Sequence, residues 1–443
     1  MNCCSRYAAA AEGDARKVDF TELPKMELEK KKRELEDSYR RFQAKKLNLN
    51  MARGKPAPDQ LGLSDGMLDV LNSRSKLSAS TGDDCRNYGL PDGLPELRAL
   101  FARMMDVDAG HVIVGGNSSL NMMFDTVACG MTHGFAGCEP WGRREHLKFL
   151  CPSPGYDRHF QVTEYFGFDL VTVAMTPTGP DMDEVEEAVK DPAVRGMWCV
   201  PKYSNPTGVT YSDETVRRIA RLKPAAKDFR VFWDNAYCVH DLTETTDPLL
   251  SLWSECEKAG TLESVFFFCS TSKITFPGGG VAAMACADGN FETIGRRNQF
   301  QTIGPDKLNQ LRHLYFLKDF DGVKAQMAKH RALLAPKFRA VERKLESELA
   351  GKNIASWSNP RGGYFISVDV LPGCAKRVVA LCAGAGVKLT GAGATFPYGK
   401  DPNDSNIRVA PTVPPIGELE QAMDLFCVAV QLAAAEKLLG GGS

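Results

Sequence analysis

One lysine stands where the sequence points to chemistry rather than to structure. Lys273 follows the very apolar segment VFFFCS, has Ser270 and Ser272 close by, and precedes three glycines in ITFPGGG. A lysine is costly to bury as a charge, and hydroxyl groups beside a glycine-rich loop are typical of an anion-binding site. The alternative is an ordinary surface lysine just past a strand. The surroundings favour a functional lysine.

Two further polar sites also follow short apolar segments. Asn205 comes after GMWCVP, where NPTG turns the chain, and Asp234 ends VFWD with Tyr237 three residues later. NPTG is a good turn by itself, and an aspartate at a strand end is also a common helix N-cap. An acid at such a position is nevertheless a frequent functional feature, so we keep these residues as candidates.

An anion site is also indicated nearer the N-terminus. HVIVGG is followed by Asn117, Ser118 and Ser119, which open a helix whose free N–H groups and hydroxyls suit a phosphate. Serine is common at helix starts without any ligand, which is the alternative. Tyr156 in PSPGYDRHF lies beyond another apolar segment, where its ring could stack on a flat cofactor or simply pack. Arg408 in SNIRVAP completes the set near the C-terminus.

The pattern of apolar segments predicts a scaffold that would bring these candidates together. From about residue 110, short apolar runs alternate with stretches long enough for helices; the runs are HVIVGG, HLKFLCP, DLVTVAM, GMWCVP, RVFWDN, SVFFFCS and VAAMACA. This alternation predicts an α/β fold with a mostly parallel sheet covered by helices. Ligands bind such sheets at the carboxyl ends of the strands, where most of the candidates lie.

A chain of 443 residues predicts more than one domain, because single cores stop growing near roughly 250–300 residues. A charged helix is expected over residues 25–46, a long amphipathic helix over 325–350, and further strands in GGYFISVDV and NIRVA. The expected organisation is a disordered tail (1–24), an N-terminal arm with part of a small domain (25–85), a large cofactor-binding domain (86–335), a C-terminal small domain (336–438) and a linker or tag remnant (439–443).

Composition excludes several classes of protein. The net charge of -1 gives no electrostatic case for binding nucleic acid or acidic membranes. No apolar run approaches the roughly 18 residues of a membrane span. The 14 cysteines form no CxxC pair and the histidines show no metal-ligand spacing, so no metal site is expected. Cys151, Cys199 and Cys269 lie in apolar runs, which fits buried thiols in a reducing, cytoplasmic location; the Ala-rich start with scattered arginines leaves organellar import open.

Taken in chain order, the candidates resemble the fold-type I, class I aminotransferases. The resemblance covers about residues 48–430, and MARGKP, GNSSLNMMFD, PGYDRHF, STSKITFPGGGVA and TIGPDK are similar to an atypical branch of aspartate aminotransferases. It implies a large domain with a mostly parallel sheet and a smaller α/β domain built from the N- and C-terminal segments. It also implies pyridoxal 5′-phosphate as cofactor. The implied reaction moves an amino group from an L-amino acid, aspartate first, to a 2-oxo acid such as 2-oxoglutarate.

The resemblance implies roles for the candidates nearest the reacting atoms. Lys273 would carry the cofactor as a Schiff base and move a proton between the substrate Cα and the cofactor C4′. Asp234 would keep the pyridine nitrogen protonated. Asn205 and Tyr237 would hydrogen-bond the ring O3′. The α-carboxylate of the substrate would be bound by Arg408, whose planar fork suits a carboxylate, with Asn205 beside it.

The outer parts of the implied site are less complete. Tyr156 would stack on the ring, and the phosphate would be surrounded by Ser118, Ser119, Ser270 and Ser272. Tyr88 matches the tyrosine that reaches the phosphate of a neighbouring subunit, which implies a homodimer. Val281 occupies the position where the family usually has a phosphate-binding arginine, so another group must neutralise the phosphate.

Substrate choice and reaction type stay open at this level. Arg296, Arg297 and Arg312 could bind the far carboxylate of a dicarboxylic substrate from the partner subunit, or could be exposed helix charges. His313, beside Arg312, is the one histidine of interest. The same fold hosts lyases, decarboxylases, acyltransferases and aromatic or alanine aminotransferases. A transcriptional regulator is disfavoured, because only about forty residues precede MARGKP and they show no DNA-binding module.

Overall fold

The computed structural model describes residues 18–440, so most of the expected N-terminal tail and the last three residues of the expected linker lie outside the described part. Residues 18–24 were expected to belong to a disordered tail, and this is wrong for them. Phe20 is buried, and its N–H donates to the carbonyl of Lys352 at 3.1 Å. An aromatic side chain there has enough apolar contact to order the segment.

The centre of the fold is an eight-stranded sheet in the order β2-β9-β8-β7-β6-β3-β4-β5. The strands from β8 to β4 run parallel, whereas β9 is antiparallel to both of its neighbours and β5 is antiparallel to β4. This confirms the predicted α/β class with its mostly parallel sheet. The bounds are β2 Val112–Val114, β3 Lys148–Ser153, β4 Asp169–Thr176, β5 Gly179–Pro180, β6 Val194–Cys199, β7 Arg230–Asp234, β8 Val265–Ser270 and β9 Ala282–Ala285.

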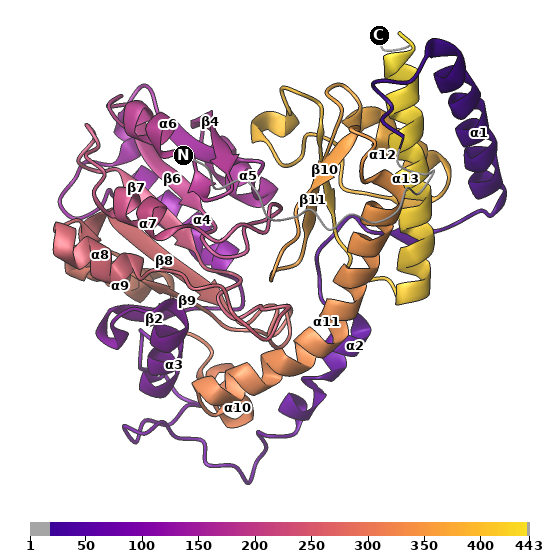
Figure 1. Cartoon of the computed structure of the whole chain (residues 1–443). Helices are drawn as coiled ribbons and strands as arrows, with labels where there is room; N and C mark the ends of the chain where they lie inside the picture. The colour runs from indigo at the N-terminus through magenta and orange to yellow at the C-terminus, as the bar shows by residue number, and fades with distance from the viewer. Residues whose placement is uncertain (1–17, 441–443) are drawn as a thin grey trace.

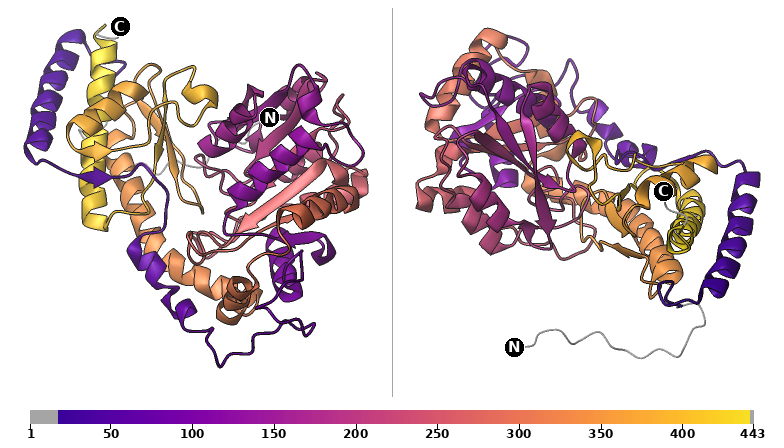
Figure 2. Two further views of the ribbon diagram at one scale, coloured as in Figure 1. Left: turned by 180° about the vertical axis from the view of Figure 1, so that it is seen from behind. Right: turned by 90° about the horizontal axis from the view of Figure 1, so that it is seen from above.

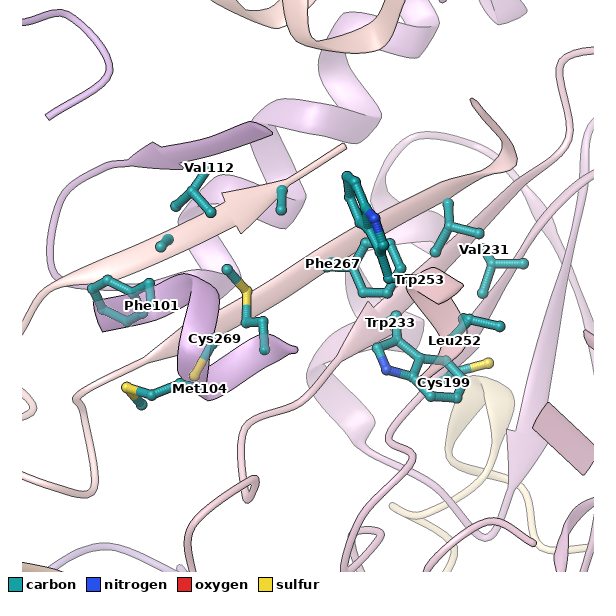
Figure 3. Close-up of a cluster of buried hydrophobic side chains, with 14 of the residues drawn as sticks. Phe101, Met104, Val112, Cys199, Val231, Trp233, Leu252, Trp253, Phe267 and Cys269 are labelled. Atoms are coloured by element: carbon teal, nitrogen blue, oxygen red, sulfur yellow. The ribbon is translucent and has the colours of Figure 1, made fainter. Parts of the chain in front are cut away.

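Helices cover both faces of this sheet (Figure 1). They are α3 Pro95–Met105, α4 Ser119–Thr132, α5 Asp157–Tyr165, α6 Met182–Ala188, α7 Asp213–Ala220, α8 Leu252–Ala259, α9 Asp288–Gln301 and α10 Lys307–Leu317. Strand β8 shows why both faces need cover. Phe267 packs on one side with Trp233 and Trp253, as Figure 3 shows, while Phe266 and Phe268 pack on the other. Alternate side chains of a strand point to opposite faces, so a wholly apolar strand fits only between two layers.

A second hydrophobic core lies outside the large sheet. It is built around a three-stranded sheet, β10-β11-β13, and a parallel pair, β1-β12. Its elements are α1 Lys25–Ala44, β1 Leu49–Asn50, β10 Ala355–Trp357, β11 Ile366–Val370, α12 Ala375–Gly384, β12 Val387–Lys388, β13 Asn406–Val409 and α13 Ile416–Leu438, with α2 Pro58–Gly62 between the two cores. Helix α1 lies along α13 in both views of Figure 2. Segments from the two ends of the chain thus share one core.

Helix α11, Phe320–Leu349, joins the two units without a break (Figure 1). Val323 and Met327 belong to the core of the large sheet, and the helix contributes to the second core from Leu334 onward. The expected boundary after residue 335 therefore falls inside a continuous helix, where its packing partners change. Ala79 and Cys85 pack in the core of the large sheet, so the end of the segment 25–85 does not belong to the smaller unit.

None of the helices between residues 18 and 440 has both the length and the apolar character needed to cross a membrane.

The packing of the large sheet predicts a sharp contrast between two methionines. Met197 on β6 is fully buried, whereas Met26 on α1 is 79 % exposed. Met197→Ala should lower the free energy of unfolding by about 2–5 kcal/mol, because it leaves a cavity in a close-packed layer, and Met26→Ala should change it by less than about 0.5 kcal/mol. Urea denaturation of both variants checks this. Equal effects of the two substitutions would contradict the assigned packing.

Candidate active site

A cavity of about 210 Å³ opens at the carboxyl ends of the central strands. The segments that follow β3, β6, β7 and β8 contribute to it, together with the start of α4. Gly54 and Phe365 close it from the smaller unit; the two lie so close that a Cβ on residue 54 would collide with the ring. Nine residues singled out in the sequence line this cavity: Ser118, Ser119, Tyr156, Asn205, Asp234, Tyr237, Ser270, Ser272 and Lys273.

Lys273 is the single lysine or arginine among the residues that line the cavity. Its amine lies 5.0 Å from the ring centre of Tyr237 and 5.8 Å from that of Tyr364. Burial lowers the pKa of Lys273, and the nearby Asp234 carboxylate only partly opposes this effect. A lysine in this setting gives up its proton more readily than a solvated one, so its nitrogen can act as a nucleophile or a base.

Asp234 is a buried carboxylate with one satisfied oxygen. His159 Nε2 donates to Oδ2 at 3.0 Å, and the imidazole stacks on Trp198 with ring centres 4.5 Å apart. Oδ1 is buried and has no hydrogen-bond partner within the part of the chain that the structure describes. A buried acceptor left open is costly, so Asp234 is arranged to receive a hydrogen bond from a donor that enters the cavity.

The sequence analysis did not identify His159 as part of the site. The histidine lies three residues after Tyr156 on α5, and the two rings meet edge to face with centres 4.9 Å apart. The spacing places both on one helix face, which was a usable signal. Nothing in the sequence, however, indicated that this face meets the end of β7.

Two tyrosines beside the cavity are held in the neutral form. Burial raises the pKa of Tyr156 to about 12, with a further contribution from the neighbouring carboxylates. Burial also raises the pKa of Tyr237 well above its usual value. Both phenols therefore keep their O–H at neutral pH and can donate a hydrogen bond to a bound ligand.

The start of α4 presents helix-end N–H groups and serine hydroxyls to one side of the cavity, an arrangement that suits an anion. Ser118 is the N-cap residue, and its hydroxyl accepts from the N–H of Asn121 at 3.4 Å. The hydroxyl of Ser272 donates to the carbonyl of Asn117 at 3.3 Å, and Ser270 donates to Ser272 at 3.1 Å. The serines that follow β8 are thereby brought to the positive end of a 14-residue helix.

Val281 has a structural role in the loop that carries Lys273. Its N–H donates to the hydroxyl of Thr271 at 2.9 Å, and its carbonyl accepts from the N–H of Thr271 at 2.8 Å. The side chain is buried in the core of the large sheet, which has no room for a solvated arginine. His313 supports the same loop from behind, with Nε2 3.2 Å from the Thr271 hydroxyl, and burial lowers the pKa of His313 to about 4.

Arg408, on β13 of the smaller unit, does not itself line the cavity but contacts two residues that do, Asn205 and Phe365. Its Nη1 donates to Asn205 Oδ1 at 3.2 Å and to Asp157 Oδ1 at 2.9 Å. The guanidinium lies over the ring of Phe365, 4.8 Å from its centre. The predicted pair of Arg408 and Asn205 is thus in contact, and Asp157 is a second residue that the sequence analysis missed.

Four predicted residues are not brought to the cavity by this chain alone. Tyr88 is 76 % exposed, and Arg296 is exposed as well. Arg297 contacts Asp125 beside a different cavity, and Arg312 donates to Asn309. Within residues 18–440, none of these side chains belongs to the lining of the Lys273 cavity.

Comparison with known proteins gives a consistent result. The model of the family described as "Aspartate amino-transferase" matches residues 23–441. A protein of Mycolicibacterium smegmatis that is described as an aminotransferase is 48 % identical over 91 % of this chain and 95 % of its own length. The aspartate aminotransferase of Corynebacterium glutamicum is 45 % identical over 90 % of this chain and 94 % of its own. The crystal structure of an aspartate transaminase from C. glutamicum superimposes with a TM-score of 0.93 at 42 % identity, covering 95 % of this chain and all of the other.

The lowered pKa of Lys273 predicts its order of reaction with aldehydes. Because the neutral amine is the reactive form, Lys273 of the protein freed of any bound pyridoxal 5′-phosphate should be methylated by formaldehyde and cyanoborohydride at a lower pH than the exposed Lys223. Peptide mapping by mass spectrometry between about pH 6 and pH 10, a range that approaches the ordinary pKa of lysine, gives the extent of methylation of each lysine against pH. A Lys273 profile at or above that of Lys223 would contradict the assignment.

Proposed function

The chain belongs to the aspartate amino-transferase family, and on that basis we propose that it moves the amino group of L-aspartate to a 2-oxo acid such as 2-oxoglutarate. It is an aminotransferase that depends on pyridoxal 5′-phosphate. The observation that carries the proposal is that Lys273, Asp234 and Asn205 line one cavity and that Arg408 contacts Asn205. That set supplies an amine, a buried acid and a carboxylate-binding fork at a single place.

The residues around the cavity fit this cofactor. The open Oδ1 of Asp234 suits the N–H of a pyridinium ring. The start of α4 with Ser118 and Ser119, together with Ser270 and Ser272 at the end of β8, suits a phosphate. In this chain the phosphate charge would be met by the helix end and hydroxyl groups, since Val281 replaces the usual arginine. When bound, the cofactor withdraws electrons from the substrate Cα and so makes its proton acidic.

The roles of the residues follow from their positions. Lys273 Nζ would hold the cofactor and move the proton at the substrate Cα. Asp234, held by His159, would keep the ring nitrogen protonated. Tyr237 and Asn205 would hold the ring oxygen, and Tyr156 would lie against the ring. Arg408 binds the α-carboxylate that every amino-acid donor shares.

The neighbouring subunit is proposed to complete the site. Two segments of the chain expose apolar side chains: Tyr88 on one, and Phe300, Ile303 and Leu308 on the other. The segments adjoin each other, since Lys307 donates to the carbonyl of Gly89 at 2.9 Å. These four residues, here called the exposed apolar patch, suit cover by a second copy of the chain. The cation that reads the far carboxylate of aspartate would also come from that copy, with Arg296, Arg297 and Arg312 as candidates.

We also propose a reducing, cytoplasmic location. Cys151, Cys199 and Cys269 are buried in β3, β6 and β8 as small apolar side chains, which agrees with the interpretation of the cysteines as core residues.

The donor and the α-carboxylate site can be tested together. With 2-oxoglutarate as acceptor, glutamate formation should be fastest with L-aspartate among aspartate, alanine and phenylalanine, and Lys273→Ala should abolish it. Arg408→Lys keeps the charge but loses the fork, so it should weaken all donors alike, by about 1.5–3 kcal/mol in kcat/KM. If alanine or phenylalanine is the better donor, the aspartate proposal fails. If Arg408→Lys spares one donor, its general role fails.

Shared sites predict complementation between two inactive variants. Tyr88→Ala lacks the residue given to the partner, and Lys273→Ala lacks the residue of its own site. A mixed dimer then has one site with both residues intact, so equal mixing after dissociation should restore about a quarter of the wild-type activity. Sedimentation checks that dimers form. Dimers without restored activity would show that Tyr88 acts within its own chain, and full activity of Tyr88→Ala before mixing would show that it has no role in the site.

A further inference from the structure

The ion pair between Arg408 and Asp157 has no place in the roles assigned so far. Arg408 is 7 % exposed, and the side chain of Asp157 is 21 % exposed. The carboxylate of Asp157 therefore occupies the guanidinium that the α-carboxylate of a substrate must also bind. Within residues 18–440, the bond to Arg408 is the one side-chain hydrogen bond of Asp157.

Capping of helix α5 does not account for Asp157. It is the first residue of α5, where an acidic side chain gains from the helix dipole. Tyr156 is the N-cap residue, and no side chain caps the helix there. The carboxylate contacts Arg408 instead, which lies on β13 in the smaller unit. The contact therefore concerns the arginine rather than the helix.

One edge of the guanidinium makes no hydrogen bond within the described residues. Both hydrogen bonds of Arg408 start at Nη1, while Nε is buried and has no partner among the described residues. Phe365 covers the planar face. With Nη1 and the face fixed, the edge with Nε and Nη2 can present its two parallel donors to a carboxylate.

We propose that Asp157 is a positioning residue for Arg408: a resident counter-ion that orients the guanidinium and weakens its hold on the α-carboxylate of substrate and product. The proposal rests on the role of Arg408 given under Proposed function. When a carboxylate ligand is bound, two carboxylates share one guanidinium, and their mutual repulsion disfavours the complex. Between turnovers Asp157 keeps a buried arginine paired, which avoids an uncompensated charge.

The test is the substitution Asp157→Asn in the holoenzyme, which keeps an acceptor oxygen and removes the charge. Carboxylate binding should tighten about tenfold, because a like charge at close range is removed. The melting temperature without ligand should fall, because Arg408 loses its counter-ion. Propionate, which has a carboxylate and no amino group, is the probe, and its dissociation constant is obtained from the rise in melting temperature with concentration. KM for L-aspartate should fall as well, while kcat does not rise.

Controls separate this effect from general damage. Asp183→Asn removes an aspartate from an exposed pair with Arg218, and it should leave propionate binding unchanged. In an Arg408→Lys background, Asp157→Asn should tighten propionate binding much less, because the two residues act through one contact. If Asp157→Asn does not fold, Asp157→Ser removes the same charge at a helix start and takes its place.

The outcomes decide the proposal in either direction. Unchanged or weaker propionate binding in the folded variant overturns it, as does equal tightening in the Arg408→Lys background. Because this readout needs no turnover, it remains valid if the enzyme does not use L-aspartate. Absence of turnover with L-aspartate would reject the proposed donor, and the role of Asp157 would then be judged by propionate binding alone.

Discussion

The site depends on a carboxylate that is buried and only half satisfied. Asp234 has His159 on one oxygen and no partner within the described residues on the other. A buried oxygen without a hydrogen bond costs free energy, so it persists only where the surrounding packing holds the residue in place. Here the phenylalanine-rich packing of β7 and β8 and the stacking of His159 on Trp198 hold Asp234 in place. The same burial lowers the pKa of Lys273, so one apolar environment prepares both the acid and the amine.

The part of the cavity formed by the start of α4 offers hydrogen-bond donors that suit a negative charge. The start of α4 and the serines near it offer N–H and hydroxyl donors without a side-chain cation. Partial charges at a helix end are fixed by the backbone, so this arrangement does not depend on a long flexible side chain. The side chain of Val281 can then pack in the core of the large sheet. Its backbone forms two hydrogen bonds with Thr271 and so fixes the loop that carries Lys273.

The sequence predicted those parts of the site that follow from sheet topology. Asp234 ends a strand, Lys273 and Asn205 come soon after one, and parallel strands bring their carboxyl ends to one edge. His159 and Asp157 were missed because their roles depend on which face of α5 meets β7 and β13, and helix periodicity does not specify the partner. Tyr88 and the three arginines do not line the cavity of the described chain; the proposed role of these residues is in a partner's site, and strand order within one chain does not specify such a contact. Phe20 and Ala79 show the same limit for domain bounds, since single buried side chains decide where a segment packs.

The two halves of the site are carried by separate sheets. Arg408 belongs to the three-stranded sheet, while Lys273 and Asp234 belong to segments of the eight-stranded one, and no strand is shared between the two. Substitutions can therefore accumulate around Arg408 without disturbing the apolar layers that hold the lysine and the aspartate. In evolutionary terms, the fold separates the inheritance of the chemistry from that of α-carboxylate binding, so that the affinity for the group shared by all donors can change while the reaction is kept.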